Sequence, residues 1–122
     1  MKLTISGEVP SQKNGKRIVR NGNFTRIISS QRVLDWKSSA IEQLREQFNG
    51  FVVTNYPISM SIIFFYGTKR RKDLDNSAAG VMDALVKAEV ITDDNVNYVD
   101  CLTLQYGGLD KENPRVEIYL DE

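Results

Sequence analysis

The 122 residues are 41% hydrophobic and 26% charged, with 16 basic and 16 acidic side chains, which predicts one globular domain with a modest core. The absence of histidine excludes a histidine-based nucleophilic triad, and the single cysteine excludes an intramolecular disulfide and, without histidine, ordinary zinc sites. No apolar run is long enough to span a membrane and the N-terminus lacks a signal-peptide pattern, so the expected location is the cytoplasm.

The charges are distributed unevenly along the chain. Residues 1–72 hold 13 basic and 4 acidic side chains, whereas residues 73–122 hold 3 basic and 12 acidic ones. One interpretation is an accident of sequence that averages out on folding. We favour the other interpretation, in which the first part builds a nucleic-acid surface beside a metal site built by the second.

The chain begins with a predicted strand and a basic arm. Residues 2–7 alternate between apolar and polar side chains, as in a strand. Residues 9–34 contain no acid, and Asn21-Gly22 predicts a short hairpin between residues 18–19 and 24–28. Residues 9–28 could be a solvated loop or, as we favour, a mobile arm on the DNA backbone. The candidate DNA-binding residues of this arm are Lys13, Lys16, Arg17, Arg20 and Arg26.

A helix and a strand follow the arm. Ser29 or Ser30 can cap a helix whose apolar positions recur at helical spacing as far as Phe48, and Asn49-Gly50 supplies its end. Lys37 falls away from the apolar stripe and is expected to be solvated. Residues 57–66 then alternate, with Ile63 and Phe65 making the second face apolar too, which predicts a central strand covered on both faces near its end.

Two carboxylates, Asp73 and Asp75, follow this strand directly. They are preceded by the basic run Lys69, Arg70, Arg71 and Lys72, whose position makes it a candidate for binding phosphate rather than only a solvated loop. Carboxylate oxygens are the protein ligands that Mg²⁺ prefers, usually one or two of them together with water and phosphate. The sequence therefore predicts a site that holds a phosphate and a divalent metal together.

A second helix is predicted from residue 77 to residue 89, capped by Asp75 or Asn76. Asp83 lies about two turns beyond the cap, roughly 12 Å along the axis, and is interpreted as structural. A second acidic pair, Asp93-Asp94, comes after this helix, and strands are predicted over residues 96–105 and 115–120. The expected fold is α/β (α+β), a single domain with one mixed sheet and two helices in the order β-α-β-α-β-β.

Three motifs in this order resemble the core of the RusA-type Holliday junction resolvases. They are Asp73-Leu74-Asp75-Asn76, Met82-Asp83-Ala84-Leu85 and Asp93-Asp94. The resemblance is dense over residues 72–94 and extends as an order of elements over the whole chain. It implies a homodimeric, Mg²⁺-dependent endodeoxyribonuclease that cuts four-way DNA in recombination and repair, encoded by a bacterium or phage.

The resemblance also assigns residues. It implies that Asp73, Asp75 and Asp94 are metal-binding catalytic carboxylates. The family has a functionally important lysine four residues after the second aspartate, a position that Ala79 occupies here. We take Lys72 as the catalytic cation in its place. A weakened junction-binding protein of the same fold, a nuclease for other branched DNA and a protein without nucleic-acid function remain the alternatives.

Asp94 is not easily brought to the other two carboxylates. A helix of about 14 residues is roughly 21 Å long, whereas the residues from 90 to 94 can return at most about 17 Å. Either the helix is shorter, or it leans toward the strand, or Asp94 completes a site across a dimer interface. The sequence does not choose among these three arrangements.

Overall fold

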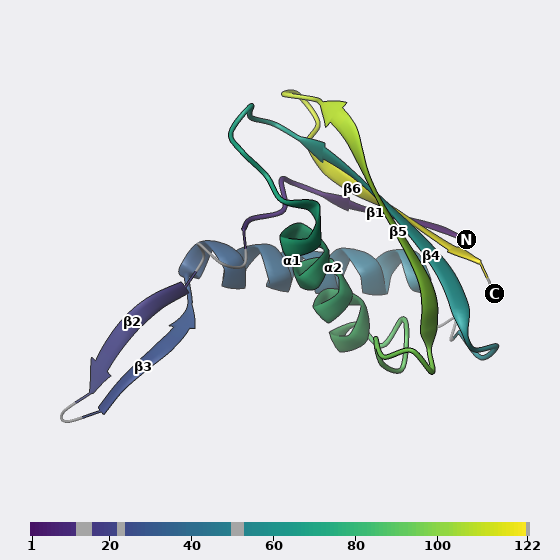
Figure 1. Cartoon of the computed structure of the whole chain (residues 1–122), viewed down its shortest axis with the longest axis horizontal. Helices are drawn as coiled ribbons and strands as arrows, with labels where there is room; N and C mark the ends of the chain where they lie inside the picture. The colour runs from purple at the N-terminus through teal and green to yellow at the C-terminus, as the bar shows by residue number, and fades with distance from the viewer. Residues whose placement is uncertain (12–15, 22–23, 50–52, 122) are drawn as a thin grey trace.

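A computed structural model describes residues 1–11, 16–21, 24–49 and 53–121, and the side chains of all of these except residues 16–21 and 24–29. Its elements follow the predicted order, with the hairpin inserted after the first strand (Figure 1). They are β1 (Lys2–Ser6), β2 (Lys16–Asn21), β3 (Phe24–Ser29), α1 (Gln31–Phe48), β4 (Ile58–Tyr66), α2 (Leu74–Lys87), β5 (Val99–Leu109) and β6 (Arg115–Asp121).

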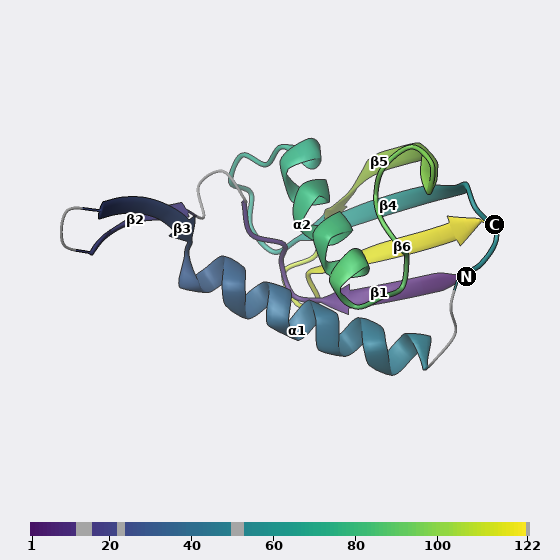
Figure 2. The ribbon, with the colours of Figure 1, turned by 90° about the horizontal axis from the view of Figure 1, so that it is seen from below.

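The main sheet has four strands in the order β1-β6-β4-β5, with β4 and β5 parallel and the other pairs antiparallel. Both helices cover the same face of this sheet (Figures 1 and 2). The predicted single domain with a mixed sheet and two helices is thus confirmed. No helix among the described residues is long and apolar enough to cross a membrane.

The strand β4 places its alternate side chains in the core. Five of its residues are at most 1% exposed, namely Ile58, Met60, Ile62, Phe64 and Tyr66. The other face of β4 carries no helix, so the prediction of a strand covered on both faces is only partly right. Ile63 and Phe65 are half-buried there, because the guanidinium of Arg115 lies 3.9 Å from the Phe65 ring centre. Gly107 of β5 also approaches closely, since a Cβ at this position would come within 2.7 Å of the Phe65 ring.

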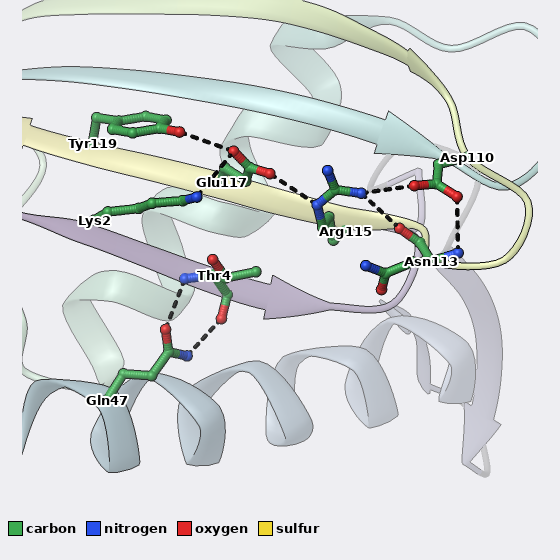
Figure 3. A network of polar contacts seen from close by, with 8 residues as sticks. All are labelled: Lys2, Thr4, Gln47, Asp110, Asn113, Arg115, Glu117 and Tyr119. Atoms are coloured by element: carbon green, nitrogen blue, oxygen red, sulfur yellow. Dashed lines mark hydrogen bonds and ion pairs between the residues drawn. The ribbon is translucent and has the colours of Figure 1, made fainter.

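Polar side chains connect the strands on this open face (Figure 3). Arg115 donates hydrogen bonds to Asp110 and Glu117 at 2.9 and 2.8 Å, and the Tyr119 hydroxyl donates to Glu117 at 2.9 Å. Burial alone would raise the pKa of Glu117, but these hydrogen bonds and the ammonium of Lys2 outweigh burial and lower it. The network holds β1, β6 and the β5–β6 connection together.

The helix α1 begins and ends as predicted. The Ser30 hydroxyl caps its first turn by accepting a hydrogen bond from Val33 N–H at 3.4 Å, and Asn49 ends it in the left-handed conformation. The side-chain amide of Gln47 accepts a hydrogen bond from Thr4 N–H in β1 at 2.8 Å (Figure 3). The amide of Gln43 does the same with Ser6 N–H, also at 2.8 Å.

The expectation that Lys37 is solvated is wrong. Its side chain is mostly buried, and its ammonium lies 2.6 Å from a carboxylate oxygen of Asp83 on α2. This ion pair joins the two helices and agrees with the structural interpretation of Asp83.

The basic arm forms a separate two-stranded sheet. The strands β2 and β3 pair antiparallel from Lys16 opposite Ser29 to Asn21 opposite Phe24, which confirms the predicted hairpin. The hairpin projects away from the body of the protein beyond the first turn of α1 (Figures 1 and 2).

Candidate active site

The two carboxylates of the Asp-Leu-Asp motif lie at the N-terminus of α2. Asp73 is the N-cap residue, with an extended backbone and no capping hydrogen bond from its side chain, and Asp75 lies in the first turn. The prediction that Asp75 or Asn76 caps the helix is therefore wrong, because the helix begins earlier. Both side chains are exposed, and Asp73 is 49% accessible. Arg71 approaches it, with its Nε 3.8 Å from a carboxylate oxygen.

Buried polar groups fix the first turn of α2 against the sheet. The hydroxyls of Tyr66 at the end of β4 and Ser77 in α2 share a hydrogen bond of 2.8 Å, and both residues are buried. The Ser11 hydroxyl donates to the side-chain oxygen of buried Asn76 at 3.3 Å. Burial raises the pKa of Tyr66, helped by the charges of Glu8 and Asp73, so its hydroxyl stays protonated at neutral pH. The aspartates are thus carried on a firmly anchored turn.

Glu8 connects the segments around this turn. Its carboxylate accepts hydrogen bonds from Gly67 N–H at 3.1 Å and from the Thr68 hydroxyl at 3.3 Å. The same carboxylate lies 3.5 Å from the Lys72 ammonium and 3.6 Å from the Arg32 guanidinium. With only 15% of its side chain exposed, Glu8 ties the end of β1, the end of β4 and the start of α1 together.

Sequence reasoning missed both Glu8 and Arg32 as site residues. The sequence does contain one indication of the role of Glu8, which is the only acid before Asp35 in a strongly basic stretch. An isolated acid among many bases is a candidate partner for several of them. The contact with the loop after β4 is long-range and could not be read from spacing.

A hollow of about 520 Å³ lies over these groups. Its lining combines four cations with hydroxyl and amide groups and one of the two motif carboxylates, and consists of Glu8, Ser11, Arg32, Thr68, Arg70, Arg71, Lys72, Asp73, Asn76 and Ser77. The partial positive charge of the N-terminus of α2 adds to the cations. This is an environment for a phosphodiester beside a carboxylate.

The predicted cations fall into two groups. Lys16, Arg17 and Arg20 lie on β2 and Arg26 lies on β3, while Lys13 lies outside the described residues. Lys69, Arg70 and Arg71 are exposed in the loop between β4 and α2. Lys72 is different, because only 21% of its side chain is exposed and its ammonium lies 5.5 Å from the Tyr66 ring centre as well as beside Glu8.

Asp94 is not brought to the other two carboxylates within one chain. It lies in the loop after α2, a helix of 14 residues that is roughly 21 Å long and ends at Lys87, two residues earlier than predicted. The residues from 88 to 94 can return at most about 25 Å, so chain length alone does not keep Asp94 from the other two carboxylates. Among the described residues, no three carboxylates or thiolates are grouped as a metal-ligand set. The Asp93 carboxylate is used inside the loop, where it accepts hydrogen bonds from Asp94 N–H and the Asn95 amide.

The residues present nevertheless suit Mg²⁺. Asp73 and Asp75 supply two exposed oxygen ligands, and the Asp73 side chain is not engaged in capping the helix. Because Mg²⁺ keeps several waters and takes only one or two carboxylates together with substrate phosphate, two such side chains near a hollow lined by cations are a donor set of the kind that suits it.

Comparison with known proteins places this site in a family. The sequence profile of the family described as endodeoxyribonuclease RusA matches residues 8–121. A crossover junction endodeoxyribonuclease RusA from Aquifex aeolicus (strain VF5) is 34% identical over 89 residues, which cover 73% of this chain and 68% of the relative.

Proposed function

This chain belongs to the RusA family of endodeoxyribonucleases that resolve Holliday junctions, and we propose that it cuts four-way DNA in recombination and repair with Mg²⁺ held by Asp73 and Asp75. The observation that carries the metal proposal is the pair of exposed carboxylates on the anchored first turn of α2, beside a hollow lined by four cations. A bound Mg²⁺ would lower the pKa of a coordinated water and offset charge on the phosphodiester.

The other residues position the DNA. Arg32, Arg70 and Arg71 surround the hollow and would hold the phosphates that flank the cleaved bond. The hairpin of β2 and β3 carries Lys16, Arg17, Arg20 and Arg26, and we assign them, with Lys13 and Lys69, to the DNA arms. Contacts of this kind are made to the backbone and give affinity and register without reading bases.

Lys72 is our candidate for the catalytic cation in place of Ala79. Ala79 is exposed on α2, so a lysine there would have room. Lys72→Ala should reduce single-turnover cleavage far more than binding, and adding Ala79→Lys should restore part of it. Normal cleavage by Lys72→Ala together with a sharp gain from Ala79→Lys alone would show instead that the protein is a weakened nuclease.

We further propose a homodimer in which Asp94 acts in the site of the second copy. The strand β5 is an edge of the sheet and, with 11 residues, is roughly 36 Å long. Asp94 precedes its N-terminal end, whereas the end of β4 and the Asp73 turn lie beside its C-terminal end, where Tyr66 is opposite Leu109. Antiparallel pairing of two β5 edges would bring one copy's Asp94 loop toward the other copy's Asp73 turn. A four-way junction has the matching two-fold symmetry.

Cleavage of a synthetic four-way junction tests the metal site. Asp75→Asn should abolish Mg²⁺-dependent cutting and leave junction binding intact or tighter, because one metal ligand and one repulsive charge are lost. Asp121→Asn, which makes the same charge change at the exposed end of β6, should cut normally. Cutting by Asp75→Asn at the wild-type rate would remove Asp75 from the site. Labelled flap and fork substrates run beside the junction would reveal a preference for other branched DNA.

Mixed dimers test the shared site. If Asp94 acts across the interface, combining Asp75→Asn and Asp94→Asn subunits creates one intact site per mixed dimer and restores nicking of one strand. If Asp94 acts within its own chain, both sites of the mixed dimer carry a substitution and the mixture stays inactive.

A further inference from the structure

Tyr106 on β5 is a solvent-exposed aromatic side chain beside the candidate active site. It is 56% exposed, more than any other aromatic residue whose side chain is described. It makes no hydrogen bond to the described residues, whereas the hydroxyl of Tyr119, which is 37% exposed, donates to Glu117. A single exposed ring is ordinary on a protein surface, and what sets Tyr106 apart is the support beneath its ring and the hollow beside it.

The ring is supported from below. Tyr106 stacks on Tyr66 with ring centres 6.0 Å apart and an angle of 29°, and Tyr66 stacks in turn on Phe64 at 6.1 Å and 10°. Phe64 and Tyr66 are buried, and Tyr66 is also held by its hydrogen bond to Ser77. The outermost ring therefore sits on a fixed column that rises from the core, and a ligand that stacks on it need not order the ring first.

A second hollow, of about 310 Å³, opens at this column. Its lining joins apolar surface to cations and consists of Tyr66, Thr68, Lys69, Arg70, Lys72, Leu74 and Tyr106. This volume is at the lower end of the roughly 300–1,000 Å³ typical of small-molecule pockets. Leu74 stands between Asp73 and Asp75 in the sequence, so the apolar part of the hollow adjoins the metal carboxylates.

We propose that Tyr106 and Leu74 form a stacking platform for one unpaired nucleobase next to the cleaved phosphodiester. Lys69 and Arg70 hold the phosphate of the same nucleotide. The chemistry of the lining matches a nucleotide, because an aromatic and apolar floor suits the flat face of a base and the cationic rim suits its phosphate. The inference rests on the proposed junction cleavage and deepens it, since a base at the branch point can leave its stack more readily than a base within a duplex.

The first test measures equilibrium binding of short single-stranded DNA, without divalent metal, to the full chain. Removing the aromatic ring on which one base stacks weakens such binding by about 5- to 150-fold. We therefore expect Tyr106→Leu to lose affinity in this range. Tyr106→Phe should bind within about twofold of the wild type because it keeps the ring. Tyr119→Leu removes an exposed tyrosine from the other face and should change nothing. The slope of affinity against salt should stay constant in all three variants, because no cation is altered.

The second test uses a four-way junction that carries 2-aminopurine at the branch point. Stacking on Tyr106 should quench its fluorescence on binding to the wild type and to Tyr106→Phe, and Tyr106→Leu should relieve the quenching. Equal affinity and equal quenching for Tyr106→Leu and the wild type would overturn the platform. A dimer that dissociates in sedimentation when Tyr106 is replaced would also overturn it, because the ring would then serve the subunit interface.

The two proposals fail separately. A wild-type protein that cuts junctions while Tyr106→Leu leaves fluorescence unchanged removes the platform alone. A wild-type protein that quenches the probe and binds single strands through Tyr106, yet never cuts a junction, removes the junction cleavage alone.

Discussion

The hydrogen bond between Tyr66 and Ser77 gives a prediction about how the catalytic turn is held. Ser77→Ala leaves the Tyr66 hydroxyl buried without its partner, and Tyr66→Phe leaves the Ser77 hydroxyl. The two losses should differ. Ser77 is in a helix and can turn its hydroxyl to the Asp73 carbonyl four residues earlier, whereas the tip of Tyr66 has no such alternative among the described groups.

The magnitudes follow from burial. An unsatisfied buried hydroxyl costs about 1–3 kcal/mol, so Ser77→Ala should lower the free energy of unfolding by that amount. Tyr66→Phe, with the serine partly rescued, should cost about 0.5–1.5 kcal/mol, the value of one ordinary hydrogen bond. Replacing both partners removes both unsatisfied groups, so the double variant should lose less than the sum of the single losses, by about 1 kcal/mol.

Urea unfolding of the four proteins at neutral pH measures this coupling. The slope against urea should be unchanged, which would show that only stability differs. Single-turnover cleavage by the same variants should fall with Ser77→Ala, because the anchored turn carries the two carboxylates that we propose as metal ligands. Additive losses in the double variant, or a cost of Ser77→Ala below about 0.5 kcal/mol, would refute the reasoning.

Three more predictions follow. Glu8→Gln removes the negative charge that Arg32 and Lys72 face, so DNA binding should tighten. The slope of affinity against salt should steepen by about 0.9 for each cation that gains a phosphate contact, which fluorescence anisotropy at several salt concentrations measures. Burial raises the pKa of Asp83 but the hydrogen bond and charge of Lys37 outweigh it and lower the pKa, so Asp83 stabilises the fold above its unfolded pKa. Because this carboxylate is half-exposed, Asp83→Asn should lower the free energy of unfolding at pH 7 by less than about 1 kcal/mol. Urea unfolding should show the difference in stability between variant and wild type disappearing as the pH falls below about 4 and through the lowered pKa. Gly107→Ala forces a methyl group against the Phe65 ring and should lower stability by about 1–3 kcal/mol, seen as a reduced Tm.

Local signals in the sequence predicted the elements well. The Ser30 cap, the apolar stripe and the Asn49 end placed α1, because capping and helical periodicity act over a few residues. Alternation placed β1 and β6, and the Asn21-Gly22 turn placed the hairpin. The strand β5 begins at Val99 and runs to Leu109, past the predicted end, because its pairing with β4 and not its own pattern sets its length.

The site was only half predictable. The closeness of Asp73 and Asp75 to the start of α2 is local and could be read from the sequence, although the helix begins earlier than predicted. The role of Glu8 depends on contacts with residues 59 and 60 positions away, which no spacing reveals. The burial of Lys37 could not be predicted from its position on α1, because its partner, Asp83, lies on another helix. Asp94 is not grouped with the other two carboxylates in the described part of one chain, and the sequence alone does not choose among the arrangements open to it.

The two edges of the main sheet differ in what they offer to another chain. On β1, the outward backbone groups of Thr4 and Ser6 are already bonded by Gln47 and Gln43, so no further strand can add there without displacing these amides. The β5 edge has no such cover among the described residues. In the proposed dimer, sheet extension through β5 would stop at two copies, since each copy would then present only its closed edge. The glutamines of α1 would thus act against growth into fibres and would limit the assembly to two copies of the chain.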